Sequence, residues 1–165
     1  MNEMRVCMES LFPIDDEIRS HWFTLPIDEE EFEQTLGVST DSEDYRITEA
    51  ELPFADEIKE DMMVGKLNDM YRTFESLPAD LKEDYGELMC HFSSLDELHQ
   101  HRYDIIHYAG CISMIDVAKF MLSENSAFQS LSEDCVRYFD FEAYGQFLED
   151  NGNFLETDHG IYELP

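Results

Sequence analysis

Histidines and cysteines that could bind a metal ion gather in the middle of the chain. Six of them lie within 22 residues: Cys90, His91, His99, His101, His107 and Cys111. Thiolate sulfur and imidazole nitrogen are the donors that structural zinc sites use. Their spacing matches no established zinc motif, and His107 and Cys111 would share one face only in a helix, whereas we predict a strand around His107. We therefore favour surface or core positions for these residues, with a zinc site as the alternative.

The sequence contains none of the short motifs that typify common enzyme classes. It has no Gly-rich phosphate-binding loop, no Gly-x-Ser-x-Gly turn, no His-Glu-x-x-His helix motif and no Asp-x-Asp-x-Asp-Gly calcium loop. Pairs of carboxylates that could serve a hydrolase are so numerous that finding one carries no information. We therefore predict a protein that is not an enzyme and needs no cofactor, with a carboxylate hydrolase as a less favoured alternative.

Acidic residues dominate the composition. The 165 residues include 39 Asp and Glu but 10 Lys and Arg, which gives a formal net charge of −29, and 43% of the residues are apolar. This apolar content is enough for a folded core. Such a chain repels nucleic acid and attracts basic surfaces. At one charge per ~1.7 Å, its net charge equals that of roughly 50 Å of duplex DNA.

The four cysteines and the hydropathy pattern predict a cytoplasmic protein. Cys7, Cys90, Cys111 and Cys135 are widely spaced and form no Cys-x-x-Cys pair, which favours free thiols in a reducing compartment. We find no secretory signal and no apolar segment of transmembrane length. We therefore expect no membrane partner.

The N-terminal part, residues 1–61, is predicted to form a small α+β subdomain with a net charge of −15. A long acidic connection joins the first two strands, Asp28 caps the helix, and Gly37 ends it. The expected elements are strands at 4–9 and 22–25, a helix at 28–36, and a weaker strand from Tyr45 that breaks at Glu49.

Residues 62–103 are predicted to form a helical subdomain with a net charge of only −4. We expect one helix along the apolar stripe Leu67, Met70, Tyr71 and Phe74, a second from Pro78 to Met89, and a third that begins with a Ser94–Glu97 capping box.

Residues 104–165 are predicted to form a second α+β subdomain, with a net charge of −10. We expect a strand at 104–108, a helix that Ser113 caps, a helix at 140–150 and a C-terminal hairpin whose turn ends at Gly160. In the 140–150 helix the spacing places Phe141, Tyr144, Phe147 and Leu148 on an apolar face. Gly152 is expected to end that helix in the left-handed conformation.

Seven segments, by their order and spacing, resemble the ArdA-type antirestriction proteins, acidic products of mobile genetic elements. The segments are Trp22–Asp28, Glu51–Phe54, His91–Ser94, Asp104–Ile106, Asp116–Ala118, Phe139–Gly145 and His159–Glu163. The stretch at 138–150 resembles the family's antirestriction motif, from which we single out Tyr138, Phe139, Asp140, Phe141, Glu142, Ala143, Tyr144 and Gly145. The chain departs from the family between Glu9 and His21, where it lacks the Gly-containing loop that precedes the Trp.

The resemblance implies an elongated α+β protein of three small subdomains that dimerises through the C-terminal one and imitates bent duplex DNA. Its partner would be the methyltransferase core of a type I restriction-modification enzyme, whose DNA-binding groove it would occupy without binding nucleic acid itself. An acidic adaptor that binds a basic protein without imitating DNA is the alternative. The carboxylates expected on the DNA-mimicking surface are Asp28, Glu29, Glu30, Glu31, Glu33, Asp41, Glu43, Asp44, Asp56, Glu57, Glu60, Asp61, Asp140, Glu142, Glu149 and Asp150.

A homodimer of so acidic a chain needs an apolar contact that offsets the repulsion between the two copies. Met114 and Ile115 lie at the start of the helix that Ser113 caps, and one small core does not easily accept both side chains. We predict that they form a two-fold interface. The alternative, equally compatible with the sequence, places both of them in the core.

Overall fold

The structure, a computed structural model, describes residues 3–165. The chain divides into two compact units, Met1–His99 and Gln100–Pro165. Each unit combines helices with a three-stranded antiparallel sheet, which confirms the predicted α+β class. The predicted boundary between residues 61 and 62 lies inside the first unit, so the division into three subdomains stays a prediction.

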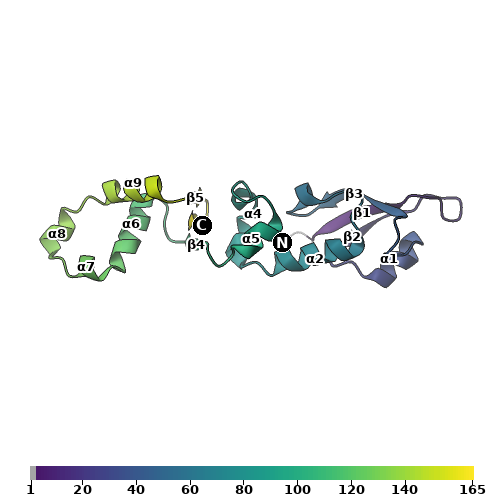
Figure 1. The fold of residues 1–165 in the computed structure, drawn as a ribbon, viewed down its shortest axis with the longest axis horizontal. Coiled ribbons are helices and arrows are strands. Elements are labelled where there is room, and N and C mark those ends of the chain that lie inside the picture. The colour runs from purple at the N-terminus through teal and green to yellow at the C-terminus, as the bar shows by residue number, and fades with distance from the viewer. Residues whose placement is uncertain (1–2) are drawn as a thin grey trace. The chain divides into compact units, whose positions relative to one another are not determined.

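The sheet of the first unit has β1 in the middle, because β1 pairs with both neighbours in the order β2-β1-β3 (Figure 1). Its strands are β1 (Arg5–Ser10), β2 (Ser20–Thr24) and β3 (Tyr45–Glu51). Where β1 pairs with β3, Met8 lies opposite Ile47 and the adjacent Cys7 lies opposite Glu49. Thr48 has no partner of its own on β1 and is therefore the extra residue of a β-bulge. The predicted break at Glu49 is therefore wrong: the bulge interrupts the alternation of side chains, and the strand continues.

The helices of the first unit are α1 (Glu29–Leu36), the 3₁₀ turn η1 (Ala55–Glu57), α2 (Val64–Glu75), α3 (Ala79–Glu83), α4 (Tyr85–Leu88) and α5 (Leu95–Gln100). The predicted helix α1 is confirmed, including Gly37 in the left-handed conformation at φ 77°. The single helix predicted from Pro78 to Met89 is wrong, because Asp84, at φ −101° and ψ 21°, separates α3 from α4.

The sheet and the helices of this unit share one core. The buried side chain of Asn68 in α2 accepts a hydrogen bond from the backbone N–H of Ile27 at 2.7 Å and donates one to its carbonyl at 2.9 Å. The rings of Phe54 and Phe74 lie 5.8 Å apart. These contacts tie the strand region to the helical region that follows it in the chain.

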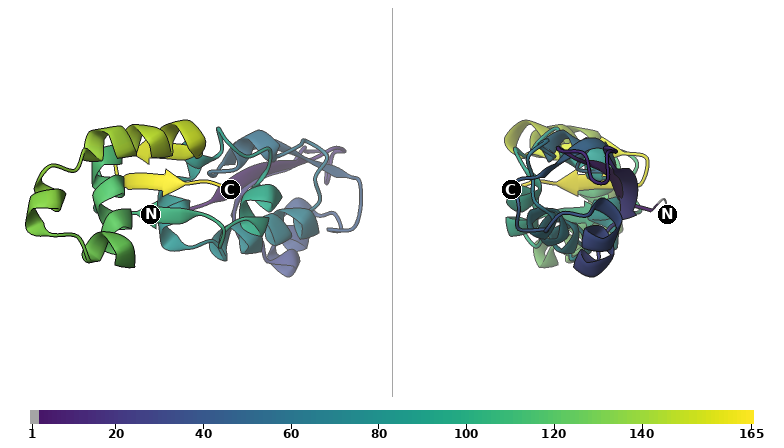
Figure 2. Two further views of the ribbon diagram at one scale, coloured as in Figure 1. Left: turned by 60° about the vertical axis from the view of Figure 1, so that its left-hand side comes forward. Right: turned by 90° about the vertical axis from the view of Figure 1, so that its right-hand side faces the viewer.

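The second unit contains the sheet β4-β6-β5 and four helices. Its helices are drawn in green to yellow in Figure 2. Its elements are β4 (Ile106–Tyr108), α6 (Met114–Ser123), α7 (Ser126–Gln129), α8 (Glu133–Arg137), α9 (Phe141–Asn151), β5 (Phe154–Thr157) and β6 (Gly160–Glu163). The capped helix α6 and the C-terminal hairpin are as predicted, and β4 covers the last three residues of the strand predicted at 104–108. The short helices α7 and α8 were not predicted, although Asn125 and Ser132 cap them.

Two glycines of this unit accept close contacts that a side chain would block. Gly160 has a φ of 127°, and a Cβ there would lie 2.5 Å from the carbonyl oxygen of Tyr108. Gly152 ends α9 with an extended backbone at φ −123°, so the left-handed conformation predicted for it is wrong. A Cβ on Gly152 would lie 2.5 Å from a ring atom of Phe154 and 3.0 Å from the carbonyl oxygen of Leu148, so a side chain there would displace the ring.

Candidate functional site

Helix α1 carries the densest group of exposed carboxylates in the first unit. Asp28 caps it by accepting the backbone N–H of Glu31 at 2.8 Å, and the acidic side chains of the first turn face solvent. Anions are favoured there because the amides of a helix N-terminus carry partial positive charge. The buried side chains of Phe32 and Leu36 fix the opposite face of the helix to the core. The carboxylates are therefore displayed from a rigid support.

The loop that follows α1 presents three further carboxylates, Asp41, Glu43 and Asp44, all exposed. The buried residue Thr40 holds this loop: its backbone N–H donates to Glu33 at 3.2 Å, and its carbonyl accepts the hydroxyl of Tyr45 at 2.6 Å. The Tyr45 oxygen also accepts the backbone N–H of Val64 at 3.0 Å. Burial raises the pKa of the Tyr45 phenol.

Glu57 is half-buried, whereas the other predicted surface carboxylates are exposed. Its side chain is half-buried and accepts the backbone N–H of Leu95 at 2.9 Å and the Tyr85 hydroxyl at 3.4 Å. Burial, and then the charge of Glu57, raise the pKa of Tyr85. The neighbouring predicted residues Asp56, Glu60 and Asp61 are exposed.

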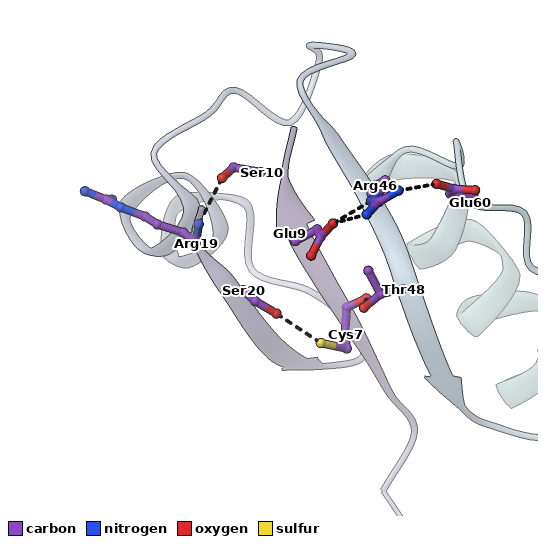
Figure 3. Close-up of polar contacts among 8 residues, drawn as sticks. All are labelled: Cys7, Glu9, Ser10, Arg19, Ser20, Arg46, Thr48 and Glu60. Carbon is purple, nitrogen blue, oxygen red and sulfur yellow. Dashed lines mark hydrogen bonds and ion pairs between the residues drawn. The ribbon is translucent and has the colours of Figure 1, made fainter. Parts of the chain in front are cut away.

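Arginines neutralise part of the acidic charge on the sheet. Arg46 donates to Glu9 at 2.5 Å and to Glu60 at 3.0 Å, and these hydrogen bonds raise the pKa of Arg46 (Figure 3). Arg5 pairs with Glu51 in the same way. Among the described residues, no arginine forms an ion pair with a carboxylate of α1 or of the loop that follows it, so these carboxylates are not neutralised in this way.

The second unit exposes the remaining predicted carboxylates on α9. Asp140 caps this helix by accepting the backbone N–H of Ala143 at 2.9 Å, and Asp150 accepts the side-chain amide of Gln146 at 2.9 Å. Glu142 and Glu149 are also exposed. All four carboxylates predicted on this helix therefore reach solvent.

The antirestriction-like motif contains a close contact between α9 and α6. Gly145 is buried, and a Cβ there would lie 2.9 Å from the carbonyl oxygen of Met114 and 3.3 Å from the nitrogen of Ile115. Tyr144 and Leu148 are half-buried, but Phe147 is exposed, so its predicted place on the apolar face is wrong. The face of α9 that packs is centred on glycine, whose missing side chain gives no hydrophobic signal.

The aromatic residues of the motif form a cluster with α7. The Phe139 ring lies 5.2 Å from that of Phe128, 5.0 Å from Phe141 and 6.1 Å from Tyr144. Tyr138, in contrast, is 81% exposed. The cluster packs α7 against the start of α9.

Met114 and Ile115 are both half-buried. Met114 packs against the core cluster that contains Tyr108, Val117 and Ile161. The dimer contact predicted for the pair stays a prediction. The adjacent Ile112 is 81% exposed, a feature that the sequence could not distinguish from core burial.

The histidines and cysteines of the middle segment are dispersed. Cys111 lies in the core of the second unit, where burial, and then the charge of Asp116, raise the pKa of its thiol. His107 lies in strand β4, as predicted, and its ring stacks on Tyr162 at 4.1 Å. Within residues 3–165, no three His, Cys, Asp or Glu side chains are grouped to hold a metal ion. No helix in that range is long and apolar enough to cross a membrane.

Comparison with known families identifies a match along nearly the whole chain. The family model described as Antirestriction protein (ArdA) matches residues 16–163. A comparison with curated proteins found no significant match. The matched range contains all seven segments whose order suggested the resemblance, including the antirestriction-like motif. The chain therefore belongs to the ArdA family of antirestriction proteins.

Proposed function

We propose that this antirestriction protein imitates duplex DNA with its surface carboxylates and occupies the DNA-binding groove of type I restriction-modification enzymes. Restriction is then blocked because the enzyme cannot bind its target site. The proposal requires no catalysis, no cofactor and no nucleic acid, and it places the protein in the cytoplasm with its target. The observation that carries it is the row of exposed carboxylates on α1.

The spacing of this row approaches that of DNA phosphates. Five of the six residues from Asp28 to Glu33 are acidic. At a rise of about 1.5 Å per residue they span ~9 Å, or one carboxylate per ~1.8 Å. Duplex DNA carries one negative charge per ~1.7 Å. Lysines and arginines that bind phosphates could therefore meet a similar density of anions on α1.

Many weak contacts would supply the affinity. An exposed ion pair contributes about 0.2–1 kcal/mol, so no single carboxylate dominates, and the summed field accelerates encounter with a basic groove. The exposed carboxylates of the loop after α1 and of residues 56–61 and, in the second unit, those of α9 would add further contacts. Glu57 would support this surface by holding Leu95 and Tyr85.

We further propose that the active form is a homodimer joined near the start of α6. Met114 and Ile115, together with the exposed Ile112, supply apolar area there. Two copies would carry a formal charge of about −58, equal to roughly 100 Å of duplex at the DNA spacing. Apolar contact at a two-fold axis would offset the repulsion between them.

A competition experiment tests the proposal. A fluorescent duplex with the target site is bound to a purified type I methyltransferase, and the protein is titrated while anisotropy is measured. DNA mimicry predicts that the duplex is displaced and that excess duplex reverses inhibition. An acidic adaptor would instead bind the enzyme together with the duplex, and that ternary complex would contradict the proposal.

A further inference from the structure

The connection between β1 and β2 is an ordered hairpin with a firmly held base. The buried residue Ser10 donates its backbone N–H to the carbonyl of Arg19 at 2.8 Å, and its hydroxyl oxygen accepts the Arg19 N–H at 3.0 Å (Figure 3). The N–H of Leu11 donates to the carbonyl of Asp44 at 2.8 Å. The base therefore belongs to the sheet and cannot move independently of it.

The tip of this hairpin is also defined by hydrogen bonds. Ile14 and Glu17 exchange backbone hydrogen bonds at 2.7 and 3.2 Å across a two-residue turn. Both turn residues, Asp15 and Asp16, have positive φ, as a type I′ turn requires. Arg19 pairs with Asp15 at 3.0 Å. We predicted an acidic connection here, and the structure adds that it is a tight hairpin.

Three large apolar side chains are exposed on this hairpin. Leu11 is 42% exposed, Phe12 62% and Ile18 49%. Pro13 restricts the backbone of Phe12 to extended conformations, so little backbone entropy would be lost there when the hairpin binds a partner.

The surroundings of these side chains determine which partner fits. Five exposed carboxylates flank them: Asp15, Asp16, Glu17, Glu43 and Asp44. Leu11 also lines a hollow of about 530 Å³ with Tyr45, Met63 and further carboxylates. A second copy of this chain would bring further negative charges against these five carboxylates. A basic partner with an apolar hollow would satisfy both the charges and the exposed apolar side chains.

We propose that this hairpin is an apolar anchor that inserts Phe12 and Ile18 into an apolar hollow bordered by lysine and arginine on the target enzyme. The inference rests on the proposed function and adds to it a contact that DNA does not offer. Contacts between exposed charges weaken as salt screens them, whereas burial of an apolar ring does not. The anchor therefore contributes affinity that persists at physiological ionic strength.

The experiment measures the Kd for a purified type I methyltransferase at several salt concentrations. Burying the exposed part of one phenylalanine corresponds to roughly tenfold in affinity. Phe12→Ser should weaken binding by about this factor at every salt concentration, leaving the slope of log Kd against log salt unchanged. Phe12→Leu should restore most of the affinity. Leu131→Ser removes a similarly exposed apolar side chain elsewhere and should bind as the wild type does.

Three results would overturn the anchor. Phe12→Ser could bind as tightly as the wild type, or it could change the salt slope as a charge variant does. Sedimentation could instead show that Phe12→Ser dissociates the wild-type oligomer, which would make the hairpin a contact between copies. Failure of DNA mimicry has a different signature: the wild type would not displace duplex, yet Phe12→Ser would still weaken enzyme binding.

Discussion

Replacing Gly145 by alanine tests the packing at the centre of the antirestriction-like motif. The new Cβ would lie 2.9 Å from the carbonyl oxygen of Met114, 3.0 Å from its carbonyl carbon and 3.3 Å from the nitrogen of Ile115. These are backbone atoms at the start of α6, so no side-chain rotation relieves the clash. Helix α9 must move away from α6, and the half-buried residues between them lose contact.

Two opposing terms set the magnitude of the change. Alanine is favoured over glycine in a helix interior by about 1 kcal/mol. An extra carbon in a packed interior costs about 1–3 kcal/mol. We expect a net loss of about 1 kcal/mol in the free energy of unfolding. For a unit of this size that lowers Tm by about 4–8 °C.

Unfolding followed by circular dichroism measures this change, and Gly65→Ala is the matched control. Gly65 lies in the first turn of α2, and a Cβ there would have no atom within 4 Å. That variant should be stabilised by up to about 1 kcal/mol. If Gly145→Ala were stabilised by the same amount, α9 and α6 would not be in close contact at this glycine, and our explanation of the motif would be wrong.

Three further predictions concern binding, assembly and pH. Glu30→Gln should hardly change inhibition in a competition assay, whereas neutralising eight or more carboxylates across residues 28–60 should abolish it; a single substitution that abolished inhibition would contradict distributed contacts. Ile115→Asp should give a folded monomer by sedimentation and circular dichroism; unfolding would place Ile115 in the core, and an intact dimer would place the interface elsewhere. Above about pH 10 the free energy of unfolding should fall, because the raised pKa of Tyr85 keeps it protonated in the folded state while the unfolded chain loses the proton. Tyr85→Phe should reduce this slope in urea titrations at different pH, and an unchanged slope would exclude Tyr85 as its cause.

Elements with strong local signals could be predicted from the sequence. The signals for helix α1, Asp28 and Gly37, lie within ten residues of each other. As predicted, Asp28 caps the start of the helix and Gly37 ends it in the left-handed conformation. Helix α6 and the C-terminal hairpin also follow from nearby residues. The short helices α7 and α8 have one turn or little more each, too few residues for an apolar period. Their caps at Asn125 and Ser132 were the available signal.

Several errors arose where a residue's environment depends on distant parts of the chain. The bulge at Thr48 is a property of the pairing of β3 with β1, more than 40 residues earlier. The Glu57 carboxylate accepts the backbone N–H of Leu95, 38 residues away, so its identity alone suggested only surface charge. Phe147 is exposed because Gly145 occupies the packed position of α9. Periodicity identifies an amphipathic helix, but it does not show which face meets the neighbouring element.

The positions of the carboxylates explain how a chain with a net charge of −29 can fold while it displays that charge. Asp28 and Asp140 each accept a backbone N–H at a helix start, at 2.8 and 2.9 Å. Glu29, Glu30 and Glu31 follow in the first turn of α1, where the helix dipole favours anions and offsets part of their mutual repulsion. Charge and fold therefore depend on some of the same side chains. Asn at a capping position removes the charge but preserves the cap, whereas Ala removes both. A loss of inhibition shared by both variants would belong to the charge, and a loss confined to Ala would belong to the helix.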